Sequence, residues 1–259
     1  MIRLITHLVA AYVFMSLLSC NSLAKKQENL WLFTHYSGDK KPGKAVLTPV
    51  SFINLQQDGM YTRDFESFDY GKWLKQRDTL LLISAKNDTI VYPLKFENNE
   101  ALQVFSEQDV IANFASQPFT PNAPAKDPFS LVNNRWRIPP THKETELQIK
   151  ERLQYHCQFW ITYFTWANDH QIETVDVRGT PSPITIYNNG FTLKSYNELP
   201  KKWHSYFYDS EDCRRANNMI YEVMQFHQIT LPQTENKYTM FISAFQQLQG
   251  YLNDVVSTR

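Results

Sequence analysis

Four closely spaced prolines between residues 116 and 128 limit the fold of this chain more than any other feature. Proline lacks a backbone N–H and fixes φ, so neither a helix nor a central strand passes through a segment in which it recurs so closely. The hydrophobic pattern also changes here, from short alternating stretches to long stretches with helical spacing. We therefore expect a β-rich domain over 30–115, a proline-rich linker over 116–128 and a second domain over 129–259.

The first domain is predicted to be an antiparallel meander. Six short apolar stretches lie between turn residues over 30–105, and Asp58-Gly59 is a strong hairpin signal because glycine takes positive φ at little cost. Such a meander curls into a partial barrel or a sandwich. Residues 107–115 are then expected to form a short helix.

The second domain is predicted to begin with a long helix. Thr141 and Glu144 have the spacing of a capping box, so this helix should start there and end near Asn168. Its apolar residues fall on one face: Ile149, Leu153, Cys157, Trp160, Phe164 and Ala167. Phe159 and Trp166 lie off that face, which indicates that a second face is also covered.

Two further helices and a small sheet complete the predicted fold. The helices should cover 209–224, with an aspartate as N-cap, and 237–256. A hairpin is expected over 184–195, with single strands over 174–178 and 228–231. The fold class is therefore α+β, with an N-terminal antiparallel meander and a C-terminal helix-dominated domain that carries a small antiparallel sheet.

Composition and motifs argue against several functional classes. The 26 Lys and Arg balance the 26 Asp and Glu, whereas a nucleic-acid binder normally has a basic excess. The chain contains no G-x-S-x-G, H-E-x-x-H, phosphate-binding loop or G-x-G-x-x-G motif. We therefore expect no catalytic residue, no cofactor and no nucleic-acid partner. A non-enzymatic function is favoured over an enzymatic one.

No metal site is expected either. The histidines and cysteines of the second domain are not spaced as metal pairs: His142, His156, Cys157, His170, His204, Cys213 and His227. Asp209, Glu211 and Asp212 lack the alternating oxygens of a calcium loop. We interpret these three residues as charge at the start of a helix.

The N-terminus has the pattern of a lipoprotein signal. Arg3 precedes an apolar run that is shorter than a membrane span and ends in Leu17-Leu18-Ser19-Cys20. This ending resembles the lipobox of bacterial lipoproteins. The resemblance implies that residues 1–19 are a signal peptide and that Cys20 receives a diacylglyceryl group before cleavage. Two or three acyl chains would then hold the protein stably on a membrane.

Residues 20–29 are polar and are expected to form a short lipidated tether. Asn21 follows the cysteine, where an Asp would favour retention in the inner membrane. We therefore predict a lipid anchor in the outer membrane of the cell envelope, with the periplasmic and the surface face both open.

A second resemblance concerns residues 30–105. Trp31, the stretches SFINLQQDGMYT and GKW, and the strand DTLLLIS are similar to those of the small lipocalin-like lipoproteins of Bacteroidota. The resemblance implies a barrel that can hold a small apolar ligand. Trp73, Tyr61, Phe65, Phe68 and Tyr70 could line such a pocket, or they could form the core of the sheet.

Two cysteines remain once Cys20 is lipidated. Cys157 and Cys213 would lie in an oxidising compartment, where a disulfide between them could contribute roughly 3–4 kcal/mol. The alternative is two buried free thiols that pack as small apolar residues.

A loop in the second domain is the best candidate for a recognition surface. Asp176 and Arg178 carry opposite charges, and Pro181 and Pro183 restrict the backbone beside them. A rigid loop of this kind can present a binding edge. The alternative is a structural turn with an Asp176–Arg178 ion pair.

Three functions stay open at this point. The favoured one is a lipid-anchored envelope protein that acts by binding or assembly, with the membrane and an envelope protein as partners. The second is a lipocalin-like carrier of a small apolar ligand. The third is an envelope enzyme of unknown class.

Overall fold

The computed structural model describes residues 29–37, 48–65, 67–76, 79–93, 95–97, 101–105, 111–117, 124–172, 182–187 and 190–254. The predicted signal peptide, Cys20 and nearly all of the tether lie outside these residues. So does the predicted strand over 174–178.

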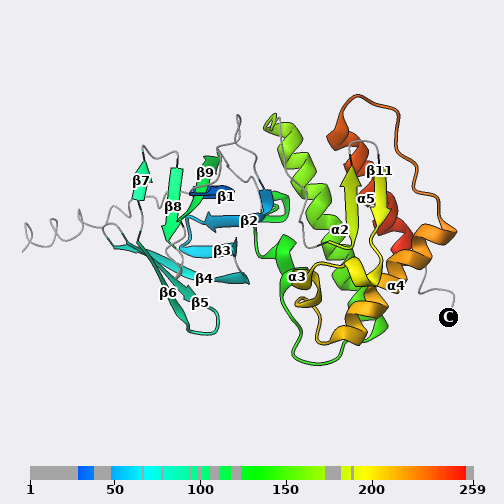
Figure 1. The fold of residues 1–259 in the computed structure, drawn as a ribbon, viewed down its shortest axis with the longest axis horizontal. Helices are drawn as coiled ribbons and strands as arrows, with labels where there is room; N and C mark the ends of the chain where they lie inside the picture. Colours follow the sequence, from blue (N-terminus) through cyan, green and yellow to red (C-terminus); the bar gives the residue numbers. More distant parts are fainter. Residues whose placement is uncertain are drawn as a thin grey trace, which may run out of the picture.

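One antiparallel sheet makes up the first part of the chain (Figure 1). In the described residues it has nine strands, in the order β6-β5-β4-β3-β2-β1-β9-β8-β7. Their bounds are β1 Asn29–Tyr36, β2 Thr48–Leu55, β3 Met60–Phe65, β4 Ser67–Gln76, β5 Thr79–Ser84, β6 Thr89–Pro93, β7 Lys95–Glu97, β8 Ala101–Phe105 and β9 Ile111–Gln117.

The topology requires this sheet to curl. The strands β6 and β7 are its two edges, yet only residue 94 separates them in the sequence. The edges must therefore approach each other, and β6 does contact β8. The result is a partial barrel, as predicted. Gly59, with φ of 86°, lies in the predicted turn between β2 and β3.

Two predictions for this part were wrong. The sheet has nine strands where six were expected, and residues 111–117 form β9 instead of the end of a helix. The strand β9 pairs with β1 along most of its length, and it buries Ala112 and Phe114 on one face. Its alternation was obscured because small and polar residues occupy the other positions.

The second part is dominated by helices and confirms the α+β fold class (Figure 1). The helices are η1 Pro124–Lys126, η2 Val132–Arg137, α2 Glu146–Asp169, η3 Tyr196–Glu198, α3 Lys201–His204, α4 Ser210–Phe226 and α5 Lys237–Asp254. The predicted hairpin is present as β10 Ile184–Tyr187 and β11 Gly190–Leu193.

The start of α2 differs from the prediction. Thr145 is the N-cap and forms a capping box with Gln148, one turn after the pair predicted at Thr141 and Glu144. Glu144 instead makes a buried ion pair with Arg152, at 2.8 Å between Oε1 and the Arg152 terminal nitrogen. The capping pattern occurs twice, at Thr141/Glu144 and at Thr145/Gln148. Because Glu144 pairs with Arg152, the second pair caps the helix.

The other helices follow the prediction closely. The Asp209 side chain accepts a hydrogen bond from the Asp212 N–H and caps α4. Both predicted faces of α2 are buried. Residues 228–231 do not form the expected strand, because the Thr230 N–H bonds to the Gln247 side chain instead of to another strand.

Strands β1 and β2 lie between two hydrophobic cores. Along them, alternate side chains point to opposite faces of the sheet. Leu30, Leu32 and Phe52 join the core of the helical part. Trp31 and Ile53 join the core inside the curled sheet. The two parts therefore share strands and pack as one body.

A buried ion pair crosses this interface. Asp64 of β3 contacts Arg137 of η2, and both side chains are fully buried. Lys202 of α3 also contacts the Asp64 carboxylate. Burial lowers the pKa of Arg137 to about 10, so the guanidinium stays charged at neutral pH. Two cations from the helical part therefore converge on one anion from the sheet.

The surroundings of the ion pair fix its geometry. The Arg137 guanidinium lies 4.5 Å from the ring centre of Trp136 and 4.7 Å from that of Phe159, which gives favourable cation–π contacts. Beside it, Asn54 of β2 donates to the Asp127 carboxylate at 3.2 Å. The interface between the sheet and the helices is thus held by polar contacts as well as by apolar packing.

We predict a strong coupling between Asp64 and Arg137. Asp64→Ala or Arg137→Met alone should each lower the free energy of unfolding by about 3–5 kcal/mol. The first leaves the buried Arg137 without its anion, and the second leaves the buried Asp64 with only the partly exposed Lys202. The double variant should lose clearly less than the sum of the two. Urea denaturation of the four proteins measures this coupling.

A surface ion pair provides the control. Lys143 and Glu211 lie 2.6 Å apart but are about half exposed, so Glu211→Ala should have only a small effect on the free energy of unfolding. Additive effects of Asp64→Ala and Arg137→Met would contradict the prediction.

Candidate functional site

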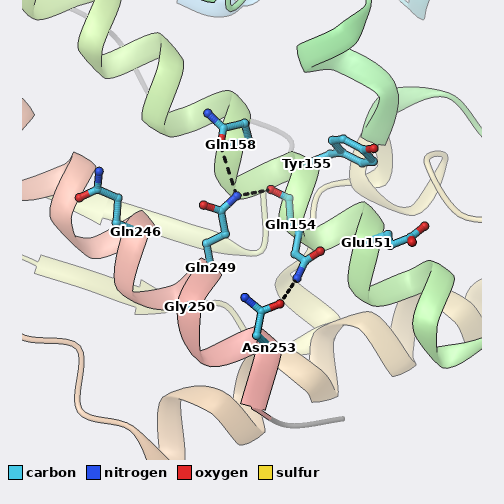
Figure 2. A pocket seen from close by; sticks show the side chains of 8 residues that line it. All are labelled: Glu151, Gln154, Tyr155, Gln158, Gln246, Gln249, Gly250 and Asn253. Carbon is cyan, nitrogen blue, oxygen red and sulfur yellow. Dashed lines mark hydrogen bonds between the residues drawn. The ribbon is translucent and has the colours of Figure 1, made fainter. Parts of the chain in front are cut away.

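Two polar stripes face each other on α2 and α5. On α2 the stripe contains Glu151, Gln154, Tyr155 and Gln158, and on α5 it contains Gln246, Gln249, Gly250 and Asn253. Both stripes have the spacing i, i+3, i+4, i+7, which places each set on one helical face. Between them lies a groove of about 570 Å³, which we call the amide groove (Figure 2).

Hydrogen bonds across the groove show that the helices are antiparallel. Gln154 donates to the Asn253 side-chain oxygen at 2.5 Å, and Gln249 donates to the Gln158 side-chain oxygen at 3.4 Å (Figure 2). Gln249 also donates to the backbone carbonyl of Gln154 at 3.2 Å. These bonds hold the amide side chains in fixed positions along the groove floor.

The groove offers polar groups with little charge. Five of its eight lining residues carry amide side chains, and Glu151 is the charged one. Tyr155 lies at one side and is about one-third exposed. Its ring faces the Arg135 guanidinium, 5.8 Å from the ring centre. The arrangement suits the hydrogen bonding of an uncharged ligand.

An aromatic core supports the groove from below. Trp160 of α2 stacks on Phe245 of α5 with ring centres 5.8 Å apart, and Phe164 lies 5.2 Å from Phe241. All four side chains are buried. Because this core is tightly packed, the distance between α2 and α5, and hence the width of the groove, is fixed.

His156 lies in the same core. Its Nε2 accepts a hydrogen bond from the Trp160 indole N–H at 3.0 Å and lies 3.1 Å from the Ser182 hydroxyl. Burial, assisted by the positive charge of Arg137, lowers the pKa of His156 to about 3. His156 is therefore neutral at physiological pH and has a structural role here.

A second polar cluster lies inside the curled sheet. The Tyr61 hydroxyl donates to Asp69 at 2.5 Å, and Arg63 contacts the Tyr92 hydroxyl and lies 3.6 Å from Asp69. Burial and the bond to Asp69 raise the pKa of Tyr61. These four groups contact one another, so we interpret them as part of the core.

The predicted aromatic pocket is divided between two surroundings. Tyr61, Phe65 and Trp73 belong to the core inside the sheet, whereas Phe68 packs against the core of the helical part. The buried residues of the core inside the sheet are apolar and aromatic: Trp31, Ile53, Leu55, Tyr61, Phe65, Trp73, Leu80, Leu82, Tyr92, Ala112 and Phe114. The core alternative therefore describes most of these aromatic residues.

The two cysteines are separate buried thiols. Cys157 of α2 and Cys213 of α4 are not bridged in this structure, and both belong to the core of the helical part. Burial raises the pKa of both thiols, that of Cys213 to about 12. They act as small apolar residues, which was the alternative to a disulfide.

The predicted recognition loop is described only at one end. Asp176, Arg178 and Pro181 lie outside the described residues. Pro183 is buried, and its carbonyl accepts a hydrogen bond from the Lys194 N–H at 2.7 Å. Pro183 therefore belongs to the base of the β10–β11 hairpin.

The acidic residues at the start of α4 have the structural role expected of them. Asp209 caps the helix, and Asp212 accepts a hydrogen bond from the Glu144 N–H at 2.9 Å. Within the described residues, no group of three His, Cys, Asp or Glu side chains could hold a metal ion.

Among the lysines of the described part, Lys202 has the pKa that departs most from its ordinary value. Burial and the positive charges of Arg137 and Arg63 lower the pKa of Lys202 to about 7. Its ammonium contacts Asp64, and its side chain is about one-quarter exposed. Because this lysine of α3 pairs with an aspartate of β3, we interpret its role as structural: it links the helices to the sheet.

The amide groove was not predicted from the sequence. Polar residues along one face are the ordinary pattern of a helix whose other face is buried, so they do not by themselves indicate a site. The signal was present in the spacing of Gln154, Gln158, Gln249 and Asn253. The sequence does not show that these two helical faces lie opposite each other, because that arrangement depends on how α2 and α5 pack.

Comparison with known proteins identifies no relative: no protein-family model, no curated protein and no solved structure matches this chain. Among the residues that the structure describes, no helix is long and apolar enough to span a membrane.

We predict that His156 makes the fold sensitive to acid. Because its pKa in the folded state lies below its value in the unfolded chain, the unfolded chain binds more protons between about pH 3 and 6.5. Stability should therefore fall as the pH is lowered through this range, by up to about 1.4 kcal/mol per pH unit from this group.

The variant His156→Gln keeps a side-chain acceptor but does not titrate. Urea denaturation at pH 4, 5 and 6 should show a smaller loss of stability for this variant than for the wild type. Equal losses in the two proteins would show that His156 is not the cause.

Proposed function

We propose that this protein is a lipid-anchored binding protein of the cell envelope and that the amide groove is its binding site. The observation that carries the proposal is the groove itself. It has the volume of a small-molecule site and a floor of amide side chains held by hydrogen bonds between two packed helices.

The N-terminal sequence supports the membrane location. The lipobox-like ending at Cys20 and the polar residues after it suit a lipidated protein on a short tether. Confinement to a membrane surface raises the effective concentration of the groove toward ligands at that surface. A modest intrinsic affinity would then be sufficient.

The described residues favour binding in the groove over the other two functions. A carrier of an apolar ligand needs a cavity in the curled sheet, whereas the described residues that face its interior form a buried cluster of apolar and aromatic side chains. An enzyme of general acid–base type needs paired titratable groups, but Glu151 is the single carboxylate among the groove residues.

Lipidation of Cys20 can be tested directly. Cells that produce the wild-type protein and grow with an alkyne analogue of palmitate should yield labelled protein, whereas Cys20→Ala should give none. Cys157→Ala is the matched control and should keep the label, because Cys157 is buried in the helical core. A label on the Cys20→Ala protein would contradict the proposed anchor.

Use of the groove can be tested by photo-crosslinking in the native host. A photoreactive phenylalanine analogue replaces the exposed Gln246 at the edge of the groove or, as control, the exposed Gln225 on α4. We expect a crosslinked species from position 246 that is absent from position 225. Identical patterns, or none at either position, would contradict binding in the groove.

A further inference from the structure

We infer that the ligand of the amide groove is a neutral, hydroxyl-rich molecule, namely a short oligosaccharide. This inference rests on the proposed function and adds the chemical class of the ligand. It is argued from the charge of the groove, the hydrogen-bonding capacity of its side chains and its lack of apolar pockets.

The charge of the groove disfavours anions. None of its eight lining residues is Lys, Arg or His, and Glu151 contributes a negative charge. A phosphate or carboxylate ligand would meet this charge, and no lining residue would compensate it. The Arg135 guanidinium lies beside the groove but contacts the ring and the hydroxyl of Tyr155. A cationic ligand would find one carboxylate and no cluster of acidic groups. An uncharged ligand is thus the best electrostatic match.

The amides match hydroxyl groups in particular. A hydroxyl both donates and accepts hydrogen bonds, and each Gln or Asn side chain offers two N–H donors and a carbonyl acceptor. In the described residues the bonds across the groove use the amide nitrogens of Gln154 and Gln249, which leaves their oxygens to accept from a ligand. The amide of Gln246 is exposed at the edge of the groove.

The lining also distinguishes a sugar from a peptide. Peptides in helix grooves are normally anchored by apolar side chains that enter apolar pockets. Here the lining contains no aliphatic side chain, and Tyr155 is its single aromatic residue. A sugar ring needs no such pocket, since its hydroxyls bind the amides and its C–H face can pack on an aromatic ring.

The groove is open at Gly250. A Cβ atom added at this position would meet no other atom within 4 Å, so the space above it is empty. Glycine weakens the interior of a helix, because it gains conformational freedom on unfolding. Its presence in α5 costs stability but leaves room for a ligand.

This position allows a variant that blocks the groove and keeps the fold. Gly250→Leu places a side chain in the open space and replaces glycine by a better helix former, so the melting temperature should rise or stay the same. The full chain, purified in detergent, is screened against an array of neutral oligosaccharides that also carries acidic oligosaccharides and neutral peptides. Isothermal titration then measures the affinity of the compounds that bind.

We expect at least one neutral oligosaccharide to bind the wild type and to bind Gly250→Leu at least tenfold more weakly. Gln249→Ala should also weaken binding at least threefold, while Gln225→Ala on α4 should bind as the wild type does. Acidic oligosaccharides and peptides should not bind.

Two results would overturn the inference. One is that no neutral oligosaccharide binds, or that those that bind have equal affinity for Gly250→Leu. The other is that a peptide binds and loses affinity in Gly250→Leu. A protein crosslinked at position 246 but not at 225 would then keep the proposed function, whereas the absence of any species crosslinked at 246 would remove both.

Discussion

The Asp64 carboxylate is the group on which the arrangement of this protein depends. It is fully buried at the interface, where it contacts Arg137 and Lys202. A buried carboxylate without cations would cost several kcal/mol, so the sheet and the helices are stable together only when these side chains meet. The aromatic rings around Arg137 leave its guanidinium few other positions. The ion pair therefore selects one orientation of the two parts, while apolar packing across β1 and β2 supplies most of the buried area.

The amide groove depends on this arrangement through α2. This helix packs on the sheet side through the core that contains Phe52 and on α5 through Trp160 and Phe164. Arg152 fastens η2 to it, because its guanidinium donates to the Trp136 carbonyl at 2.8 Å and also pairs with Glu144. A groove whose floor consists of amides hydrogen-bonded to one another needs such support, since a shift of one helix would break those bonds. Rigid positioning of the polar groups is what a binding site requires.

Local patterns allowed much of the fold to be predicted. The apolar faces of α2, α4 and α5, the Asp209 cap and the turn at Gly59 each depend on residues close in the sequence. Features set by distant residues could not be predicted. The strand β9 is recognised by its pairing with β1, and Glu144 is withdrawn from the expected cap by Arg152 and Asp212. Asp64 and Arg137 lie 73 residues apart, and nothing local marks either as a partner. The same holds for the groove, whose two polar stripes are regular but whose pairing is tertiary.

The central claim is that sheet and helices form one cooperative body, joined at Asp64. Native-state hydrogen exchange tests it most directly, because it measures the opening free energy of each segment separately. The account predicts that the slowest amides of β2–β3 and of α2 open with the same free energy and that Asp64→Asn lowers both by the same amount. If the variant lowers protection in the sheet and leaves α2 unchanged, the two parts are independent and the account is wrong.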